Sequence, residues 1–214
     1  MLSVRGLNVS IAGASILESV DLDVGAGALT GLMGRNGAGK TTCMRAVMGL
    51  IPARAGAVDY DGADLIARPA HDRARLGIGY MPEDRRLVPE LTVRENVLVP
   101  AWAGRFKDAE TRLAWIYGLM PEVESMATRK AMQLSGGQQK LVALARALMS
   151  GRKLLLLDEP FEGVAPALAH RLVEVLSNLK GEGLSVLLSE SDSTHSAGLI
   201  DALFVIERGR IHRK

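Results

Sequence analysis

The feature that most constrains this chain is a glycine-rich segment near its N-terminus. Residues 34–41 read Gly-Arg-Asn-Gly-Ala-Gly-Lys-Thr and fit the pattern G-x-x-x-x-G-K-[ST]. An apolar strand pattern ending at Leu32-Met33 precedes the segment, and a helical pattern begins near Lys40. Glycines allow backbone N–H groups to surround a phosphate, and the start of a helix adds partial positive charge. The segment therefore predicts a phosphate-binding loop between a strand and a helix.

This loop supplies the first candidate binding residues. We expect the Lys40 amine to reach the β- and γ-phosphates of a nucleotide and the Thr41 hydroxyl to bind Mg²⁺. The alternative is a glycine-rich turn that does no more than begin a helix. The candidate nucleotide-binding residues here are Gly34, Arg35, Asn36, Gly37, Ala38, Gly39, Lys40, Thr41 and Thr42.

An acidic pair follows four consecutive leucines. The run Leu154–Leu157 is uniformly apolar, as in a strand buried on both faces of a parallel sheet. Asp158 and Glu159 would then lie at the carboxyl end of this strand, where open α/β sheets bind ligands. We expect Asp158 to hold Mg²⁺ through its water shell and Glu159 to orient or deprotonate an attacking water molecule.

A third motif, Leu134-Ser135-Gly136-Gly137-Gln138, begins a predicted helix. Glycines and a free hydroxyl at a helix start suit an anion, although a simple capped helix would look the same. Because the Lys40 loop already provides one phosphate site, a second one is best explained if it faces the nucleotide of another molecule. The candidate residues are Ser135, Gly136, Gly137 and Gln138.

The remaining pattern predicts one α/β domain over residues 1–214. Short strands are expected within Leu2–Leu32, a helix begins at Pro166, and the pattern from about 83 to 151 is helical. We expect residues 1–82 and 152–214 to form the nucleotide-binding core and residues 83–151 a helical subdomain. Further strands are expected at Val58–Tyr60, Ile78–Met81, Val186–Leu188 and Phe204–Ile206.

Composition excludes several other classes of protein. The chain has 26 Lys and Arg against 24 Asp and Glu, which argues against a strongly basic nucleic-acid binder. Its single cysteine, Cys43, excludes an internal disulfide and a cysteine-based zinc site. The N-terminal residues lack the basic and apolar regions of a signal peptide, and no apolar run approaches a membrane span. We therefore expect a cytoplasmic protein.

Together the three motifs resemble those of the ATP-binding subunit of ABC transporters. GRNGAGKTT is similar to Walker A, LSGGQ to the ABC signature and LLLLDEP to Walker B with its adjacent glutamate. The resemblance implies a P-loop NTPase core (RecA-like, mostly parallel sheet), an N-terminal antiparallel β subdomain and an inserted α-helical signature subdomain. It also implies ATP and Mg²⁺ as cofactors. ATP would be held between two head-to-tail subunits, with Ser135 and Gly137 of one completing the site of the other.

The segment Met81–Val97, together with DEPFEGVAP, is similar to the ATPases of branched-chain amino-acid and related amide or urea importers. That similarity implies a second ATPase subunit, identical or a sister chain, integral membrane permease subunits and, indirectly, a solute-binding protein. The chain would then lie on the inner face of the plasma membrane, attached through the permease. The segment Glu83–Leu91 would pass motion to the permease.

Three positions depart from the family pattern. Ile11 stands where many members stack adenine on an aromatic ring, so we expect weaker ATP binding. Glu83 replaces the Q-loop glutamine, and its carboxylate can still meet Mg²⁺ or water. Ser191 replaces the switch histidine, and a hydroxyl can donate one hydrogen bond to the γ-phosphate without carrying charge. We therefore expect slow hydrolysis, or hydrolysis mainly at the partner's site, unless His195 substitutes for the missing imidazole.

Two other functions stay open. A soluble ABC ATPase without a permease would usually need insertions or paired cassettes, for which 214 residues leave no room. A catalytically weak ATP-binding partner of a sister ATPase is favoured by Ser191 and Ile11. The presence of Lys40, Asp158 and Glu159 argues against it.

Overall fold

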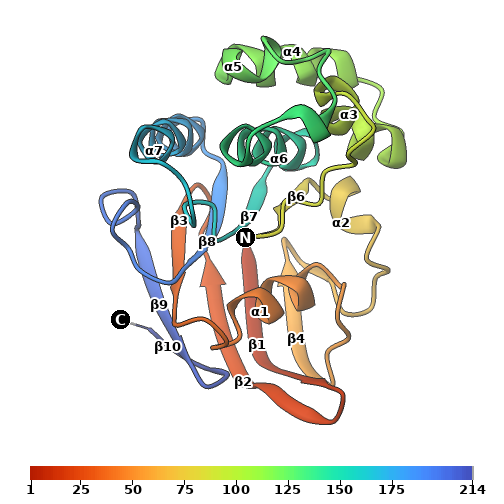
Figure 1. Ribbon diagram of the computed structural model, residues 1–214. Coiled ribbons are helices and arrows are strands. Elements are labelled where there is room, and N and C mark those ends of the chain that lie inside the picture. The colour runs from red at the N-terminus through yellow and green to blue at the C-terminus, as the bar shows by residue number, and fades with distance from the viewer. Residues whose placement is uncertain (214) are drawn as a thin grey trace.

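The computed structural model describes residues 1–213 and contains two β-sheets with helices around them (Figure 1). The smaller sheet is antiparallel, with strand order β2-β1-β4-β5. The long hairpin of this sheet turns through Ala12 and Gly13, both at positive φ. The four strands are β1 (Leu2–Ile11), β2 (Ala14–Val24), β4 (Ala55–Tyr60) and β5 (Ala63–Asp64).

The larger sheet has the order β10-β9-β3-β8-β7-β6, and every pair in it except β9–β10 is parallel. Parallel neighbours need crossover connections, which the helices between the strands supply. The carboxyl ends of β3, β7 and β8 consequently lie at one edge. The six strands are β3 (Leu29–Met33), β6 (Ile78–Met81), β7 (Leu154–Asp158), β8 (Ser185–Glu190), β9 (Ala202–Glu207) and β10 (Arg210–Arg213).

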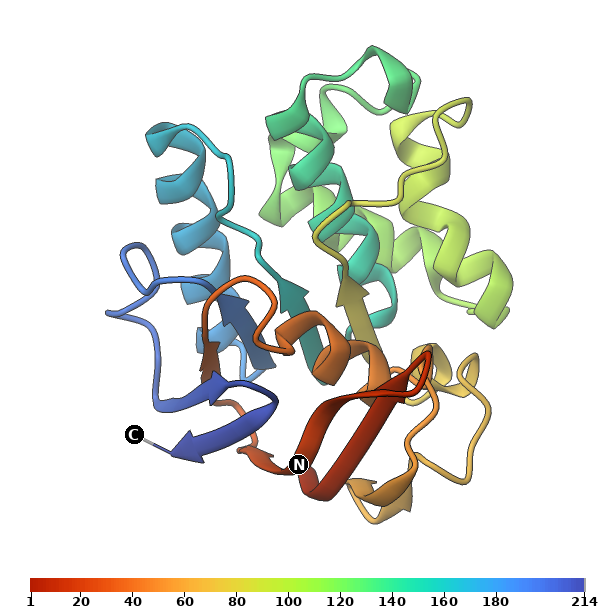
Figure 2. The same cartoon turned by 60° about the horizontal axis from the view of Figure 1, so that its bottom comes forward.

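The helices divide between the sheets and a separate cluster. Helices α3 to α6 gather at the top of Figure 1, away from the β1–β2 hairpin, while α1 lies near the centre of Figure 2 between the two sheets. None of the helices within residues 1–213 is both long and apolar enough to cross a membrane. The helices are α1 (Lys40–Val47), α2 (Asp72–Arg75), α3 (Val93–Gly104), α4 (Ala109–Leu119), α5 (Pro121–Glu124), η1 (Ala131–Gln133), α6 (Gly136–Ser150) and α7 (Pro166–Gly181).

The expected fold class is confirmed: an α/β core with a mostly parallel sheet, an antiparallel β subdomain and an inserted helical segment. The helix predicted to begin at Pro166 does so, and it ends at Gly181. The strands β5 and β10 and the helix α2 were not predicted from the sequence. Each of these elements is two to four residues long, which is too short for a periodic pattern to show.

Alternate side chains of β7 face two different apolar cores. Leu154 and Leu156 pack with Met44 of α1 and with the antiparallel sheet, whereas Leu155 and Leu157 pack with residues of α6 and α7. All four leucines are fully buried. This is the two-sided burial that a uniformly apolar parallel strand requires, and it fixes the end of β7 between the two layers.

The helical segment is joined to the sheet by close contact between α6 and β6. A Cβ added to Gly79 of β6 would overlap the carbonyl oxygen of Ala147 and lie 2.8 Å from the Cα of Gly151. Neither neighbour is the end of a flexible side chain, so the backbone itself would have to shift. Gly118 in α4 differs, because nothing lies within 4 Å of a Cβ built there.

These two glycines predict opposite effects on stability. Gly79→Ala should lower the free energy of unfolding by about 2–3 kcal/mol because it overpacks the contact between α6 and β6. Gly118→Ala should leave it unchanged or raise it by up to about 1 kcal/mol, because alanine is the better helix former. Urea denaturation of both variants beside the parent chain measures the difference. Equal effects at the two positions would contradict this account of the contact.

Candidate functional site

The glycine-rich loop joins β3 to α1, and its geometry depends on glycine. Gly39 is the N-cap of α1 with φ +114°, and a Cβ there would lie 2.8 Å from Leu17 Cδ2. This N-cap has no side chain to accept a hydrogen bond, so the first N–H groups of α1 stay available to an anion. Arg35, Asn36 and Gly37 at the tip of the loop are exposed. The loop fits a phosphate.

The Lys40 side chain is buried and meets the acidic pair. Its Nζ donates to the carbonyl oxygens of Gly34 at 2.5 Å and Arg35 at 3.2 Å. The same nitrogen forms an ion pair of 2.9 Å with Glu159 Oε1, in which both side chains are less than 10% exposed. Two of the predicted catalytic residues, 119 positions apart in the chain, are therefore in direct contact.

Ser191 joins this contact from the end of β8. Its Oγ lies 2.8 Å from Asn36 Oδ1, 2.9 Å from Glu159 Oε1 and 3.4 Å from Lys40 Nζ. Its N–H donates to Glu159 Oε2 at 3.2 Å. The structure thus places Ser191 with the phosphate loop and the glutamate. His195 lies near the same position, in a pocket lined also by Asn36, Glu159 and Ser191.

Asp158 ends β7 and is fully buried. Its Oδ1 accepts a hydrogen bond of 2.6 Å from Ser189 Oγ, and its Oδ2 accepts a longer one of 3.4 Å from Tyr80 Oη. Burial raises the pKa of Asp158, while hydrogen bonds from the hydroxyls of Ser189 and Thr41 act against that rise. The next residue, Glu159, turns away from the strand with φ +49°.

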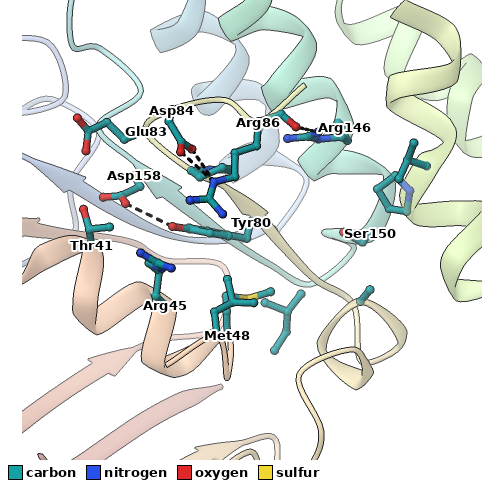
Figure 3. Close-up of a pocket in the computed structure, with 16 residues that line it drawn as sticks. Thr41, Arg45, Met48, Tyr80, Glu83, Asp84, Arg86, Arg146, Ser150 and Asp158 are labelled. Carbon is teal, nitrogen blue, oxygen red and sulfur yellow. Dashed lines mark hydrogen bonds and ion pairs between the residues drawn. The ribbon is translucent and has the colours of Figure 1, made fainter. Parts of the chain in front are cut away.

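Thr41 and Asp158 lie at one end of a pocket of about 460 Å³ between α1 and the helical segment. Figure 3 shows Glu83 close to them, with Tyr80 between Asp158 and Arg86. Arg45 and Arg146 also line this pocket, which we call the Tyr80 pocket. The three residues expected to meet Mg²⁺ are thus neighbours at one end of it.

The donor set suits Mg²⁺. A hydroxyl and a carboxylate are hard oxygen ligands, and Mg²⁺ commonly binds one or two carboxylates together with substrate phosphates and water. No group of three or more His, Cys, Asp or Glu side chains arranged to hold a metal occurs within residues 1–213. A cation here would therefore use Thr41, Asp158 and oxygens supplied by phosphate and water.

The signature residues lie elsewhere. Ser135 is the N-cap of α6 and forms a reciprocal capping box with Gln138, with hydrogen bonds of 3.3 and 3.0 Å. The pocket beside Gly136 contains no residue of the phosphate loop, so the structure does not join this motif to the Lys40 site of the same chain. Ile11 stands at the tip of the β1–β2 hairpin and is 43% exposed. Its role at adenine stays a prediction.

Sequence reasoning missed three residues that contact the acidic pair. Tyr80 and Ser189 hydrogen-bond to Asp158, and Lys140 of α6 donates to the carbonyl oxygens of Glu159, at 2.9 Å, and Glu162. Lys140 is buried. The available signals were a polar residue at the end of each apolar strand and a lysine within the apolar stripe of a helix.

Glu190 is a further buried carboxyl group beside the loop. Its backbone carbonyl accepts the N–H of Gly34 at 3.1 Å, and its side chain accepts a hydrogen bond from Ser196 Oγ. Burial raises the pKa of Glu190 to about 7, and the carboxylates of Glu159 and Asp192 act in the same direction, against the bond from Ser196. The folded chain therefore keeps a proton on Glu190 to a higher pH than an exposed carboxyl group would.

Comparisons with known proteins show what the whole chain is similar to. A family model described as ABC transporter matches residues 17–162. The chain is 34% identical to the high-affinity branched-chain amino acid transport ATP-binding protein BraG of Pseudomonas aeruginosa, over 99% of this chain and 91% of that protein. It is 33% identical to the lipopolysaccharide export system ATP-binding protein LptB of Escherichia coli, over 98% and 88%. A nucleotide-free ATP-binding cassette from an ABC transporter matches with a TM-score of 0.86 and 28% identity, over 99% and 89%.

Glu190 predicts a pH dependence of stability. Its pKa is raised from 4.5 to about 7 on folding, so the folded chain keeps a proton that the unfolded chain releases. Its contribution is fully present below pH 4.5 and is lost as the pH rises through about 7. Between pH 5 and pH 8 the unfolding free energy of the parent should therefore fall by up to about 3 kcal/mol relative to that of Glu190→Gln, which has no carboxyl group to titrate.

Urea denaturation at four pH values across this range provides the measurement. Glu182→Gln, at an exposed position after α7, is the matched control and should run parallel to the parent chain. A Glu190→Gln curve that also stays parallel to the parent would show that this carboxyl does not change its pKa on folding.

Proposed function

The chain belongs to the ABC transporter family as an ATP-hydrolysing cassette, and from this premise we propose that it powers an importer of branched-chain or other amino acids or of small amides. BraG is named for branched-chain amino acid transport and LptB for lipopolysaccharide export, at nearly equal identity. The similarity of Met81–Val97 to the importer ATPases is what supports the importer in this proposal.

The observation that carries the proposed chemistry is the buried contact of Lys40 with Glu159 at the mouth of the phosphate loop. An incoming triphosphate competes with Glu159 for the Lys40 amine, since both offer anionic oxygens to one cation. When Lys40 turns to phosphate, the carboxylate loses its ion-pair partner and is free to accept a proton from water. Ser191 N–H, at 3.2 Å from Glu159 Oε2, keeps the carboxylate directed at the loop.

The hydroxyl of Thr41 and the carboxylate of Asp158 would hold Mg²⁺ beside the phosphates. The ion supplies charge neutralisation of the phosphate oxygens as the bond to the γ-phosphate breaks. Glu83, at the same end of the Tyr80 pocket (Figure 3), is proposed to meet the ion or its water. The loop from Gly34 to Thr42 would bind the phosphates, and Ile11 would contact adenine without a ring face.

We assign the signature motif to a partner subunit. Ser135, Gly136, Gly137 and Gln138 are separate from the Lys40 loop within one chain, so a head-to-tail pair would give each ATP both sets of groups. One neighbour in structure, at 24% identity, is a dimeric bacterial ABC transporter cassette. The pair would consist of two copies or of this chain and a sister.

The membrane partners are proposed as permease subunits, with a solute-binding protein acting through them at the inner face of the plasma membrane. Residues 1–82 and 152–214 would serve as the nucleotide core and residues 83–151 as the segment that moves against it. The Tyr80 pocket lies between these two parts and is lined by Arg45, Arg86 and Arg146. The adjoining segment Glu83–Leu91 is the proposed contact with the permease.

A second candidate is a catalytically weak partner of a sister ATPase. The observation that favours it is the placement of an uncharged Ser191 hydroxyl, rather than an imidazole, against Glu159 and Asn36. This second candidate has the same ATP site as the proposed importer ATPase, and the two differ only in the rate of ATP turnover.

ATP hydrolysis measured against protein concentration tests the proposed function. The rate per chain should rise with concentration, because a composite site needs two chains. Glu159→Gln should lower kcat by about 100-fold or more while ATP still binds. Lys40→Ala should weaken ATP binding by about tenfold or more, because a charge-assisted contact is lost.

Lys107→Ala, in the exposed loop between α3 and α4, is the control and should behave as the parent. ATP binding through Lys40 with negligible turnover at any concentration would instead favour the catalytically weak partner. Turnover that survives in Glu159→Gln would contradict the assignment of the water-activating group.

The hydroxyl at position 191 makes a separate prediction. Ser191→His should raise kcat three- to tenfold in the assembled transporter, with little change in KM, since an imidazole can bring charge to the γ-phosphate. Ser191→Ala provides the comparison and should not raise kcat. If Ser191→His leaves kcat unchanged in proteoliposomes, the serine is not what limits hydrolysis.

A further inference from the structure

Ser189 is a buried polar residue that follows a run of apolar residues in β8. It lies on β8 in register with Asp158 of the neighbouring parallel strand β7. The preceding residues Leu187 and Leu188 are fully buried, and so is Ser189 itself. A buried hydroxyl costs free energy unless it is hydrogen-bonded, so the partners of this side chain account for its presence.

One hydroxyl serves both members of the acidic pair. Ser189 Oγ donates to Asp158 Oδ1 at 2.6 Å and accepts the N–H of Glu159 at 3.3 Å. A hydroxyl has one hydrogen to give and lone pairs to receive, so it can do both at once. The same N–H of Glu159 also reaches the Ser189 carbonyl oxygen at 3.1 Å. Ser189 thus ties the carboxylate of Asp158 to the backbone of Glu159.

The backbone at this point needs support. Glu159 has φ +49°, a conformation that costs a non-glycine residue about 1–3 kcal/mol and persists only where neighbours enforce it. The bonds from Glu159 N–H to Ser189 hold the turn, and the bond to Asp158 orients the carboxylate that precedes it. The other carboxylate oxygen, Oδ2, has a long contact of 3.4 Å with Tyr80 Oη.

The hydrogen bond from Ser189 to Asp158 Oδ1 also fixes the direction in which Asp158 Oδ2 points. With Oδ1 bonded to Ser189 on the β8 side, Asp158 presents its other oxygen to Tyr80 in the pocket that Thr41 also lines (Figure 3). Without the serine, the carboxylate could rotate about its terminal bond, which has broad torsional preferences. The orientation of the carboxylate would then be set only by the Thr41 hydroxyl and the long bond from Tyr80.

We propose that Ser189 is a positioning residue of this site: its hydroxyl orients the Asp158 carboxylate toward Thr41 and thereby sets the affinity for the divalent cation. The inference rests on the proposed role of Asp158 toward Mg²⁺. It assigns to β8 a function that the motifs of the sequence do not reveal, because Ser189 belongs to none of them.

The test is the binding of Mn²⁺, detected by electron paramagnetic resonance, to the full chain in the presence of ADP. Ser189→Ala should weaken Mn²⁺ binding about tenfold, the size of one lost hydrogen bond to a charged group. The affinity for ADP in the presence of EDTA should stay within about twofold, because the phosphate loop is untouched. Ser189→Thr keeps the hydroxyl and should retain Mn²⁺ binding.

Ser185→Ala is the matched control. Ser185 is on the same strand and equally buried, and its hydroxyl accepts the N–H of Gly27 at 2.9 Å, away from the acidic pair. It should lower the melting temperature without changing Mn²⁺ affinity. Ser189→Cys, close to serine in size but a weak donor, should lose Mn²⁺ binding as Ser189→Ala does, and it replaces that variant if alanine impairs folding.

The variant Asp158→Asn distinguishes a failure of the proposed metal-binding role of Asp158 from a failure of the positioning role of Ser189. If this variant loses Mn²⁺ binding and Ser189→Ala and Ser189→Cys do not, the positioning role is wrong and the role of Asp158 stands. If Asp158→Asn binds Mn²⁺ as the parent does, the proposed role of Asp158 is wrong and the inference about Ser189 falls with it. Loss of metal-free ADP affinity in Ser189→Ala equal to its loss of Mn²⁺ affinity would overturn the inference, because it would mark a general structural defect.

Discussion

The site depends on three parallel strands that end at the same edge of one sheet. The register pairs Met33 of β3 with Glu190 of β8, and Asp158 of β7 with Ser189 of β8. Segments more than a hundred residues apart therefore leave the sheet side by side. The phosphate loop, the acidic pair and Ser191 come within hydrogen-bond distance without any loop having to reach across the molecule. The buried leucines of β7, packed on both faces, keep this edge in place.

The buried charges at this edge are organised for chemistry more than for stability. Removing an ammonium and a carboxylate from water costs free energy that their attraction repays only in good geometry, so a buried ion pair is weak support for a fold. Lys40 and Glu159 meet that condition through extra hydrogen bonds to loop carbonyl oxygens and to Ser191. In the proposed mechanism, this pair is exchanged for a contact between Lys40 and phosphate when ATP binds.

The features that were predicted from the sequence are those that a short local pattern encodes. The phosphate loop, the acidic end of β7 and the capped start of α6 each lie within a few consecutive residues, and the structure has a loop, a strand end and a capped helix there. The contacts of Ser189 and Tyr80 with Asp158 were not predicted. They depend on which strand lies beside which and in what register, and the residues involved are 31 and 78 positions from Asp158. Local periodicity carries no information about such pairings.

Lys140 gives α6 a second role besides presenting the signature at its first turn. Its ammonium donates to the carbonyl oxygens of Glu159 and Glu162, so it joins the first turns of α6 directly to the acidic turn. In the proposed head-to-tail pair, the acidic turn would lie at the ATP of its own subunit, and the signature at the start of α6 would lie at the ATP of the neighbour. Occupancy of either site would then alter the other by an equal free energy, since such linkage is reciprocal. Lys140 would then couple the binding of ATP at one site to the binding of ATP at the other.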